Sequence, residues 1–139
     1  MERFFGEACV PERMSALNLA FIGDCVFDLF VREYLVCTLE APVNTLHRRA
    51  VEQVCCGAQA KAAQQLMPWF TEEEKQIYLR GRNAHTAHLP RNATPADYHA
   101  ATALEAVFGY LYLKGELDRL RFLFTVIRQQ ETKDRSDGT

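Results

Sequence analysis

The segment over residues 17–32 constrains the fold most, because it is almost entirely apolar and yet contains two carboxylates, Asp24 and Asp28. Its spacing predicts a helix whose apolar residues face a core. A carboxylate is costly to bury unless it is paired, hydrogen-bonded or bound to a metal ion. Asp28 has Arg32 one turn later, and a structural pair between them is the simplest interpretation of that acid. Asp24 is therefore the stronger candidate for a functional site.

A second apolar segment, residues 103–113, also predicts a helix and contains one acid, Glu105. Each of the two acids has a glycine nearby, Gly23 beside Asp24 and Gly109 one turn after Glu105. A glycine lets another backbone or a ligand come close. Two such helices suggest an interface at which both carboxylates hold Mg²⁺, an ion that takes oxygen ligands and keeps several waters. The spacing alone leaves a buried ion network open as the alternative.

Helical spacing runs through most of the chain, with no strand alternation and no internal repeat, so we expect an all-α fold. The length of 139 residues favours one domain with a sizeable core. Thr71 and Glu74 form a capping box, and Thr94 before Pro95 is typical of a helix start. The expected helices cover approximately residues 14–38, 45–65, 71–81, 95–115 and 116–130.

The cysteines and the N-terminus favour a reducing, cytoplasmic location. The chain has five cysteines, an odd number, and no Cys-x-x-Cys pair, which indicates free thiols and no disulfide framework. No basic segment followed by an apolar run is present at the start, so we expect no signal peptide. The charge-free apolar run from residue 14 to 23 is too short to cross a bilayer, so no membrane association is expected.

Two segments of the sequence resemble the ribonuclease III family. Residues 19–28 are similar to its signature helix, whose kernel is aromatic-aliphatic-Gly-Asp, and residues 104–113 are similar to its second acidic motif. The short Mini-III branch of that family is indicated by further stretches: residues 47–51, 58–61, 80–84 and 90–92. The resemblance covers residues 14–124, with the motifs in the same order.

The resemblance implies an all-α, homodimeric ribonuclease III-type endonuclease domain that cleaves double-stranded RNA. Asp24 and Glu105 would be both catalytic residues and ligands of Mg²⁺, for which Mn²⁺ can substitute. The metal would activate a water to attack the phosphodiester, giving 5′-phosphate and 3′-hydroxyl ends. A precursor of ribosomal RNA is the substrate that the resemblance suggests.

Two acids of the full-length family members are replaced here. A glutamate four residues before Asp24 is Ala20 in this chain, and an aspartate three residues before Glu105 is Thr102. Thr102 and Asp28 are candidates to hold water molecules bound to the metal. Because fewer carboxylates are available to bind a metal, a catalytically silent dimer of the same fold that binds duplex RNA is an alternative function. A helical interaction module, whose acids only pair with bases, is a third interpretation.

We expect a catalytic domain over residues 1–130, a disordered polar tail over 131–139, and no double-stranded-RNA-binding domain. The catalytic dimer would therefore have to make all contacts with the RNA duplex. The net charge is −2, but basic and polar residues gather in two regions, residues 47–61 and 80–92. Contact with RNA is a better interpretation than metal binding for His85 and His88, the two histidines of the second region. The candidate RNA-binding residues are Arg48, Arg49, Lys61, Arg80, Arg82, Asn83, His85, His88, Arg91 and Asn92.

Overall fold

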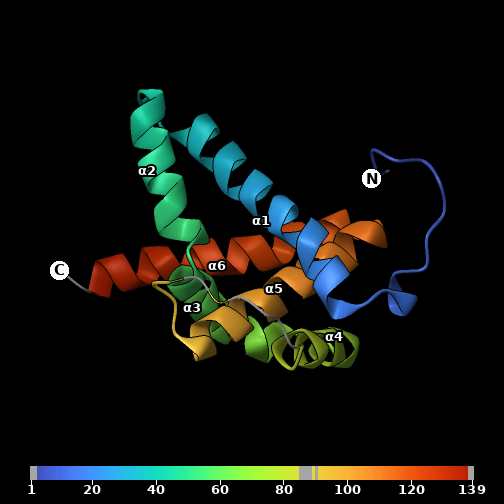
Figure 1. The fold of residues 1–139 in the computed structure, drawn as a ribbon. Helices are drawn as coiled ribbons and strands as arrows, with labels where there is room; N and C mark the ends of the chain where they lie inside the picture. The colour runs from blue at the N-terminus through green and yellow to red at the C-terminus, as the bar shows by residue number, and fades with distance from the viewer. Residues whose placement is uncertain (1–2, 85–88, 90, 138–139) are drawn as a thin grey trace.

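The computed structural model describes residues 3–84, 89 and 91–137, and within them the chain is helical with no strand. Helix α5 runs through the centre, and α1, α3, α4 and α6 all pack against it (Figure 1). Helix α2 packs on α1 and α3. The helices are α1 (Ala16–Thr38), α2 (Val43–Val54), α3 (Cys56–Leu66), α4 (Glu72–Arg82), α5 (Pro95–Leu113) and α6 (Leu117–Asp137), with 3₁₀ turns at Pro11–Arg13 and Met67–Trp69.

The core is built around α5, which is buried on nearly every side from Ala101 to Leu111. Glu105 is the one residue in that stretch that is not fully buried. Phe27 of α1 lies against Phe108 of α5, with ring centroids 5.4 Å apart, and against Phe124 of α6 at 6.2 Å. The central place of α5 thus follows from its mostly apolar sequence, because a helix that is apolar all round must be surrounded by protein.

Two helix starts agree with the sequence signals. Thr71 accepts a hydrogen bond from the Glu74 backbone, and the Glu74 carboxylate accepts one from the Thr71 backbone at 2.9 Å, which is a complete capping box. The Thr94 hydroxyl accepts from the Asp97 backbone at 3.1 Å, with Pro95 at the first helical position. Side-chain caps of this kind satisfy the free N–H groups of the first helical turn.

The expected single helix over residues 45–65 is two helices in the structure. The chain becomes extended at Cys55, with φ −67° and ψ 158°, and Gly57 lies inside α3. Neither α2 nor α3 contains a proline, and Gly57, two residues after the break, is the weakest helix former near it. The break lets α2 pack on α1 while α3 turns to pack on α5. Tertiary packing overrides helix propensity here.

The last helix is longer than expected. The sequence predicts a disordered tail over residues 131–139, whereas the described part of this segment, residues 131–137, is the end of α6. Residues such as Glu, Gln, Lys and Arg have good intrinsic helix propensity, so the polar segment can extend a helix that is already formed. No helix in the described part of the chain is long and apolar enough to cross a membrane.

Candidate active site at the crossing of two helices

Helices α1 and α5 touch backbone to backbone at two glycines. A Cβ atom at Gly23 would overlap the carbonyl group of Glu105, and one at Gly109 would overlap the carbonyl group of Leu19. No other residue type fits at either position without moving a helix. This crossing places Asp24, the neighbour of Gly23, beside the helix that carries Glu105.

The two acids meet at this crossing. The Asp24 side chain lies on the exposed side of α1, while Glu105 is half-buried in α5. Burial is the larger of the causes that raise the pKa of the Glu105 carboxyl to about 8, and the hydrogen bond and negative charge of Asp24 add to it. Two carboxylates this close repel each other when both are ionised. The pair is therefore suited to share a proton or a cation.

The first turn of α3 closes the site on the side of Glu105. Gln59 is 2% exposed. Its amide lowers the pKa of the Glu105 carboxyl, but burial and Asp24 raise that pKa by more. Burial raises the pKa of the Cys56 thiol, with Glu105 the next largest cause. Sequence reasoning missed both residues, because nothing in an alanine-rich segment indicates which of its faces meets α5.

The chemistry of this donor set fits Mg²⁺ or Mn²⁺. Both acids offer carboxylate oxygens, and a divalent cation would offset their mutual repulsion. Among residues 3–84, 89 and 91–137, no group of three or more His, Cys, Asp or Glu side chains is arranged to hold a metal. An ion held by two carboxylates alone keeps several waters, which is the usual state of protein-bound Mg²⁺.

The structure gives other partners to the two residues that we considered as supports for metal-bound water. Asp28 accepts a hydrogen bond from Arg32 at 3.0 Å, as its structural interpretation predicted. The hydroxyl of Thr102 donates to the Tyr98 carbonyl at 3.0 Å and is buried. These contacts account for both side chains without a role at the metal. Ala20 is buried in the core.

The candidate RNA-binding residues occupy several surfaces. Arg48 and Arg49 are exposed on α2, and Lys61 is exposed on α3. Arg82 and Asn83 are exposed where α4 ends, and Arg91 and Asn92 are exposed in the turn before α5. His85 and His88 lie outside the described residues.

Arg80 also has a structural contact, because it donates a hydrogen bond of 2.6 Å to the carbonyl of Met14. It thereby ties α4 to the segment in front of α1. The C-terminal end of α4 comes close to α5, since a Cβ atom at Gly81 would lie 2.8 Å from the Cα of Ala103. The basic end of α4 is thus held two residues along α5 from Glu105.

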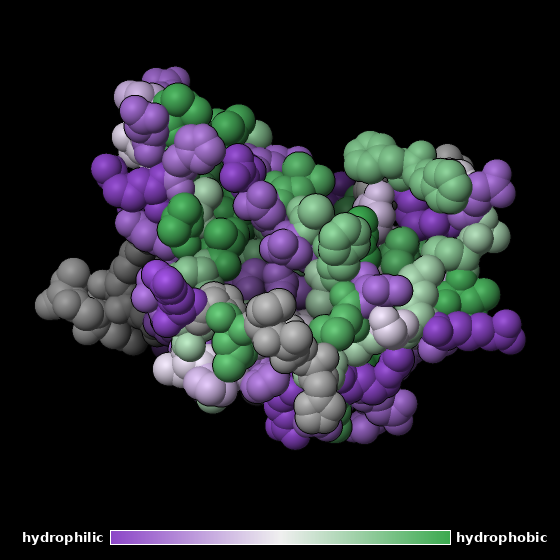
Figure 2. Space-filling model, in the orientation of Figure 1, coloured by the Kyte–Doolittle hydropathy of each residue, from purple (hydrophilic) through white to green (hydrophobic). Residues whose placement is uncertain are grey.

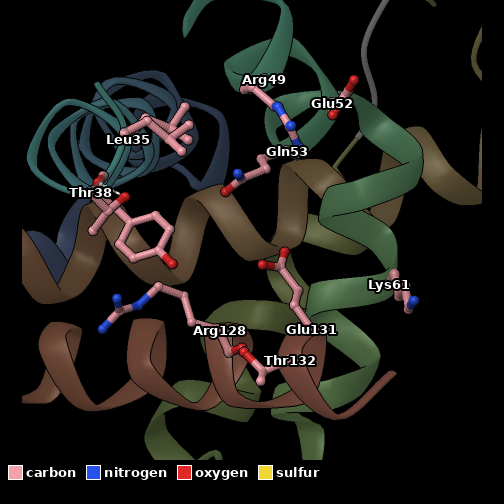
Figure 3. A pocket seen from close by; sticks show the side chains of 11 residues that line it. Leu35, Thr38, Arg49, Glu52, Gln53, Lys61, Arg128, Glu131 and Thr132 are labelled. Carbon is pink, nitrogen blue, oxygen red and sulfur yellow. Dashed lines mark hydrogen bonds between the residues drawn. The ribbon is translucent and has the colours of Figure 1, made fainter. Parts of the chain in front are cut away.

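A separate cavity of about 400 Å³ lies between α1, α2, α3 and α6. In Figure 3, Arg49, Gln53 and Glu131 point into it, and Lys61 lies at its edge. Its lining carries both charge signs, including Glu52. The cavity therefore has no strong preference for an anion, and Asp24 and Glu105 do not line it.

The comparisons with known proteins agree with the two motifs. The ribonuclease III domain family matches residues 17–116. Mini-ribonuclease 3 of Symbiobacterium thermophilum is 44% identical over 110 residues, covering 79% of this chain and 85% of that protein. Mini-ribonuclease 3 of Synechocystis is 39% identical over 131 residues, covering 93% and 88% respectively.

A solved structure has the same fold. A protein from Fusobacterium nucleatum, known from a crystal structure, superposes with a TM-score of 0.78 at 29% identity, covering 86% of this chain and 95% of that one. The family match includes both glycine–acid pairs at the crossing of α1 and α5. The chain is therefore a member of the ribonuclease III family, as its two acidic motifs predicted.

Proposed function

We propose that this protein is an endoribonuclease that cleaves double-stranded RNA with the aid of Mg²⁺ held by Asp24 and Glu105. The observation that carries the proposal is the glycine crossing, which brings two carboxylates from distant parts of the sequence to one place. The similarity to Mini-ribonuclease 3 proteins supports the ribonuclease activity. A precursor of ribosomal RNA is the substrate to test first.

The residues of the chain have two tasks in this reaction. Asp24 and Glu105 would hold the cation, and the backbone contact between α1 and α5 would keep their spacing fixed. When bound, the cation would activate water and offset the negative charge that develops on the phosphate oxygens, which favours 5′-phosphate and 3′-hydroxyl products. Exposed arginines on α2 and at the end of α4 would bind the phosphates of the duplex.

Dimer formation through α1 is part of the proposal. An exposed apolar row runs along this helix, with Phe21 81% exposed, Leu29 56% and Val36 65%. Figure 2 shows hydrophobic surface beside α1 and over the N-terminal segment, bounded by hydrophilic residues. A second copy of the chain is the occupant that would bury the same row on both sides of a twofold axis. Each strand of an RNA duplex would then lie at the Asp24 and Glu105 side chains of one protomer.

The test is cleavage of a long RNA duplex with Mg²⁺ by the wild-type protein and by Asp24→Asn. This change keeps the side-chain volume and removes the charge, so we expect cleavage to fall at least about 100-fold, as for a lost catalytic group. Asp28→Asn is the matched control, because Asp28 is paired with Arg32 on the same helix and should be dispensable. Equal rates for Asp24→Asn and wild type would contradict the proposal.

The replacement of two acids favours a second candidate, a catalytically silent dimer that binds duplex RNA. Ala20 and Thr102 offer no carboxylate, and the Thr102 hydroxyl is already bonded to Tyr98. Retained duplex binding by the wild-type protein, with no cleavage at any Mg²⁺ or Mn²⁺ concentration, would favour this candidate over the enzyme.

A further inference from the structure

Gln59 of α3 is an unusual residue to find buried. The polar or charged side chains that are buried in the described part of the chain are Gln59, Glu74 and Thr102. Glu74 is bonded to Arg119 and to the backbone of Thr71, and Thr102 is bonded to the carbonyl of Tyr98. The Nε2 atom of Gln59 makes no hydrogen bond of standard geometry to any described residue.

A buried amide donor without a partner destabilises a fold, because it loses its hydrogen bonds to water and gains none. An apolar side chain of the same size would pack between α3 and α5 without that cost. The neighbours of Gln59 along α3 show that the face is otherwise apolar, since Ala60, Ala62 and Ala63 are all buried. Packing alone therefore does not explain the amide.

The position of the amide points to Glu105. Gln59 lies one turn after Cys56 on α3, the helix that packs on α5. The Gln59 amide is close enough to lower the pKa of the Glu105 carboxyl, and Glu105 is close enough to raise the pKa of the Cys56 thiol. A carboxylate that binds a divalent cation is itself held by hydrogen bonds from neighbouring groups, and loss of such a group weakens metal binding about 10- to 100-fold. An oxygen of Glu105 that did not bind the cation would be able to accept a hydrogen bond from such a neighbouring group.

We propose that Gln59 is a positioning residue for Glu105, and that its Nε2 group donates to the carboxylate when a divalent cation is bound between Asp24 and Glu105. Gln59 itself would not touch the cation or the RNA. This inference rests on the proposed function, and it adds a contact that neither acidic motif contains. The Nε2 donor is already close enough to lower the pKa of Glu105, and in the metal-bound protein it would complete a hydrogen bond of standard geometry to that carboxylate.

The test uses Gln59→Met, which keeps the length of the side chain and removes both polar groups, with Gln59→Leu as a second apolar variant. Gln64→Met is the matched control, because Gln64 is exposed on the same helix. Mn²⁺ binding to each protein without RNA is measured by titration calorimetry. We expect about 10-fold weaker binding for both position-59 variants and no change for Gln64→Met.

Stability and the metal dependence of cleavage separate positioning from a structural role. Without metal, Gln59→Met should unfold at the same temperature as wild type or higher, because the unbonded amide is gone. Half-maximal cleavage should need about 10-fold more Mg²⁺, with the rate largely recovered at saturating Mg²⁺. A loss of stability in both apolar variants without metal would instead assign Gln59 a structural role and overturn the inference.

The outcomes also distinguish this inference from the proposed function. If wild type binds Mn²⁺, Asp24→Asn does not, and Gln59→Met binds as wild type does, the positioning role is wrong and the proposed function stands. If wild type binds no Mn²⁺, both are wrong.

Discussion

Gly23 of α1 lies directly against the backbone carbonyl of Glu105 in α5, with no room for a β-carbon between the two helices. The contact fixes the place of Asp24, which follows Gly23 in the sequence, relative to the acid on the other helix. Gly23 therefore affects both the stability of the core and the relative positions of Asp24 and Glu105.

Gly23→Ala should therefore lower both stability and metal affinity. The added methyl group meets backbone atoms that cannot move aside individually, so we expect the free energy of unfolding to fall by about 3 kcal/mol, at the upper end for overpacked cores. Urea unfolding measures this loss, and Mn²⁺ titration measures the effect on the acid pair.

Gly57→Ala is the control for Gly23→Ala. A Cβ atom there would have one near neighbour, an Asp97 carboxylate oxygen at 3.8 Å, which is ordinary contact. Alanine in this helix should leave the protein unchanged or stabilise it by about 0.5–1 kcal/mol. Equal stability of Gly23→Ala and wild type would show that the two helices are not packed as described.

The acid pair should make the metal-free protein less stable as pH rises. The pKa of Glu105 is about 8 in the folded chain, against 4.5 for an unperturbed glutamate, first because of burial and then because of Asp24. Between these values the folded state binds more protons than the unfolded state. Stabilisation present below about pH 4.5 is therefore lost progressively as the pH approaches 8.

Urea unfolding at several pH values, with and without Mn²⁺, tests this dependence. Glu105→Gln should remove the contribution of this group to the slope, whereas Glu116→Gln, at an exposed position after α5, should keep it. Mn²⁺ should stabilise the wild-type protein more at pH 8 than at pH 5, because protons compete with the metal for the carboxylates. A slope that is the same in Glu105→Gln and wild type would contradict the raised pKa.

The buried ion pair between Glu74 and Arg119 should be required for stability. Arg119 donates to both Glu74 oxygens at 2.8 Å, and the Glu74 side chain is 4% exposed. Arg119→Met leaves a buried carboxylate without its partner, so we expect a loss of about 3 kcal/mol in urea unfolding.

The exposed pair between Asp118 and Arg121 provides the comparison for Arg119→Met. Its side chains are 99% and 64% exposed, so Arg121→Met should change the free energy of unfolding by less than about 0.5 kcal/mol. If both changes cost the same, burial is not what makes the Glu74 pair important.

A charge in the apolar row of α1 should separate the dimer. Phe21→Glu would bury a carboxylate in the proposed interface, while a monomer would be little affected because Phe21 is 81% exposed. Sedimentation velocity should show a shift from dimer to monomer. Leu79→Glu, at another partly exposed apolar position, on α4, is the control and should leave the oligomeric state unchanged.

Duplex RNA binding should weaken steeply with salt, because phosphate contacts release counterions. Arg49→Gln should lower the slope of log affinity against log salt by about 1 if Arg49 contacts one phosphate. Lys133→Gln, at an exposed position on α6, should leave the slope unchanged. Binding that does not depend on salt would contradict a phosphate-based interface.

The helix class, several helix starts and the pair between Asp28 and Arg32 could be predicted from the sequence because their signals are local. Thr71 and Thr94 cap helices by bonds to residues three positions away, and Asp28 pairs with Arg32 within one helix. The glycines beside Asp24 and Glu105 also predicted a close approach, although not which backbone would fill the space. The comparisons confirmed the family.

The sequence by itself thus determined an all-helical chain with two acids in apolar helices, because periodicity and capping depend on residues within one or two turns. Only the tertiary structure decided that the chain turns at Cys55, and that Gln59 is buried facing Glu105. Both depend on how α3 packs on α5, and that packing minimises exposed apolar surface across segments far apart in the sequence.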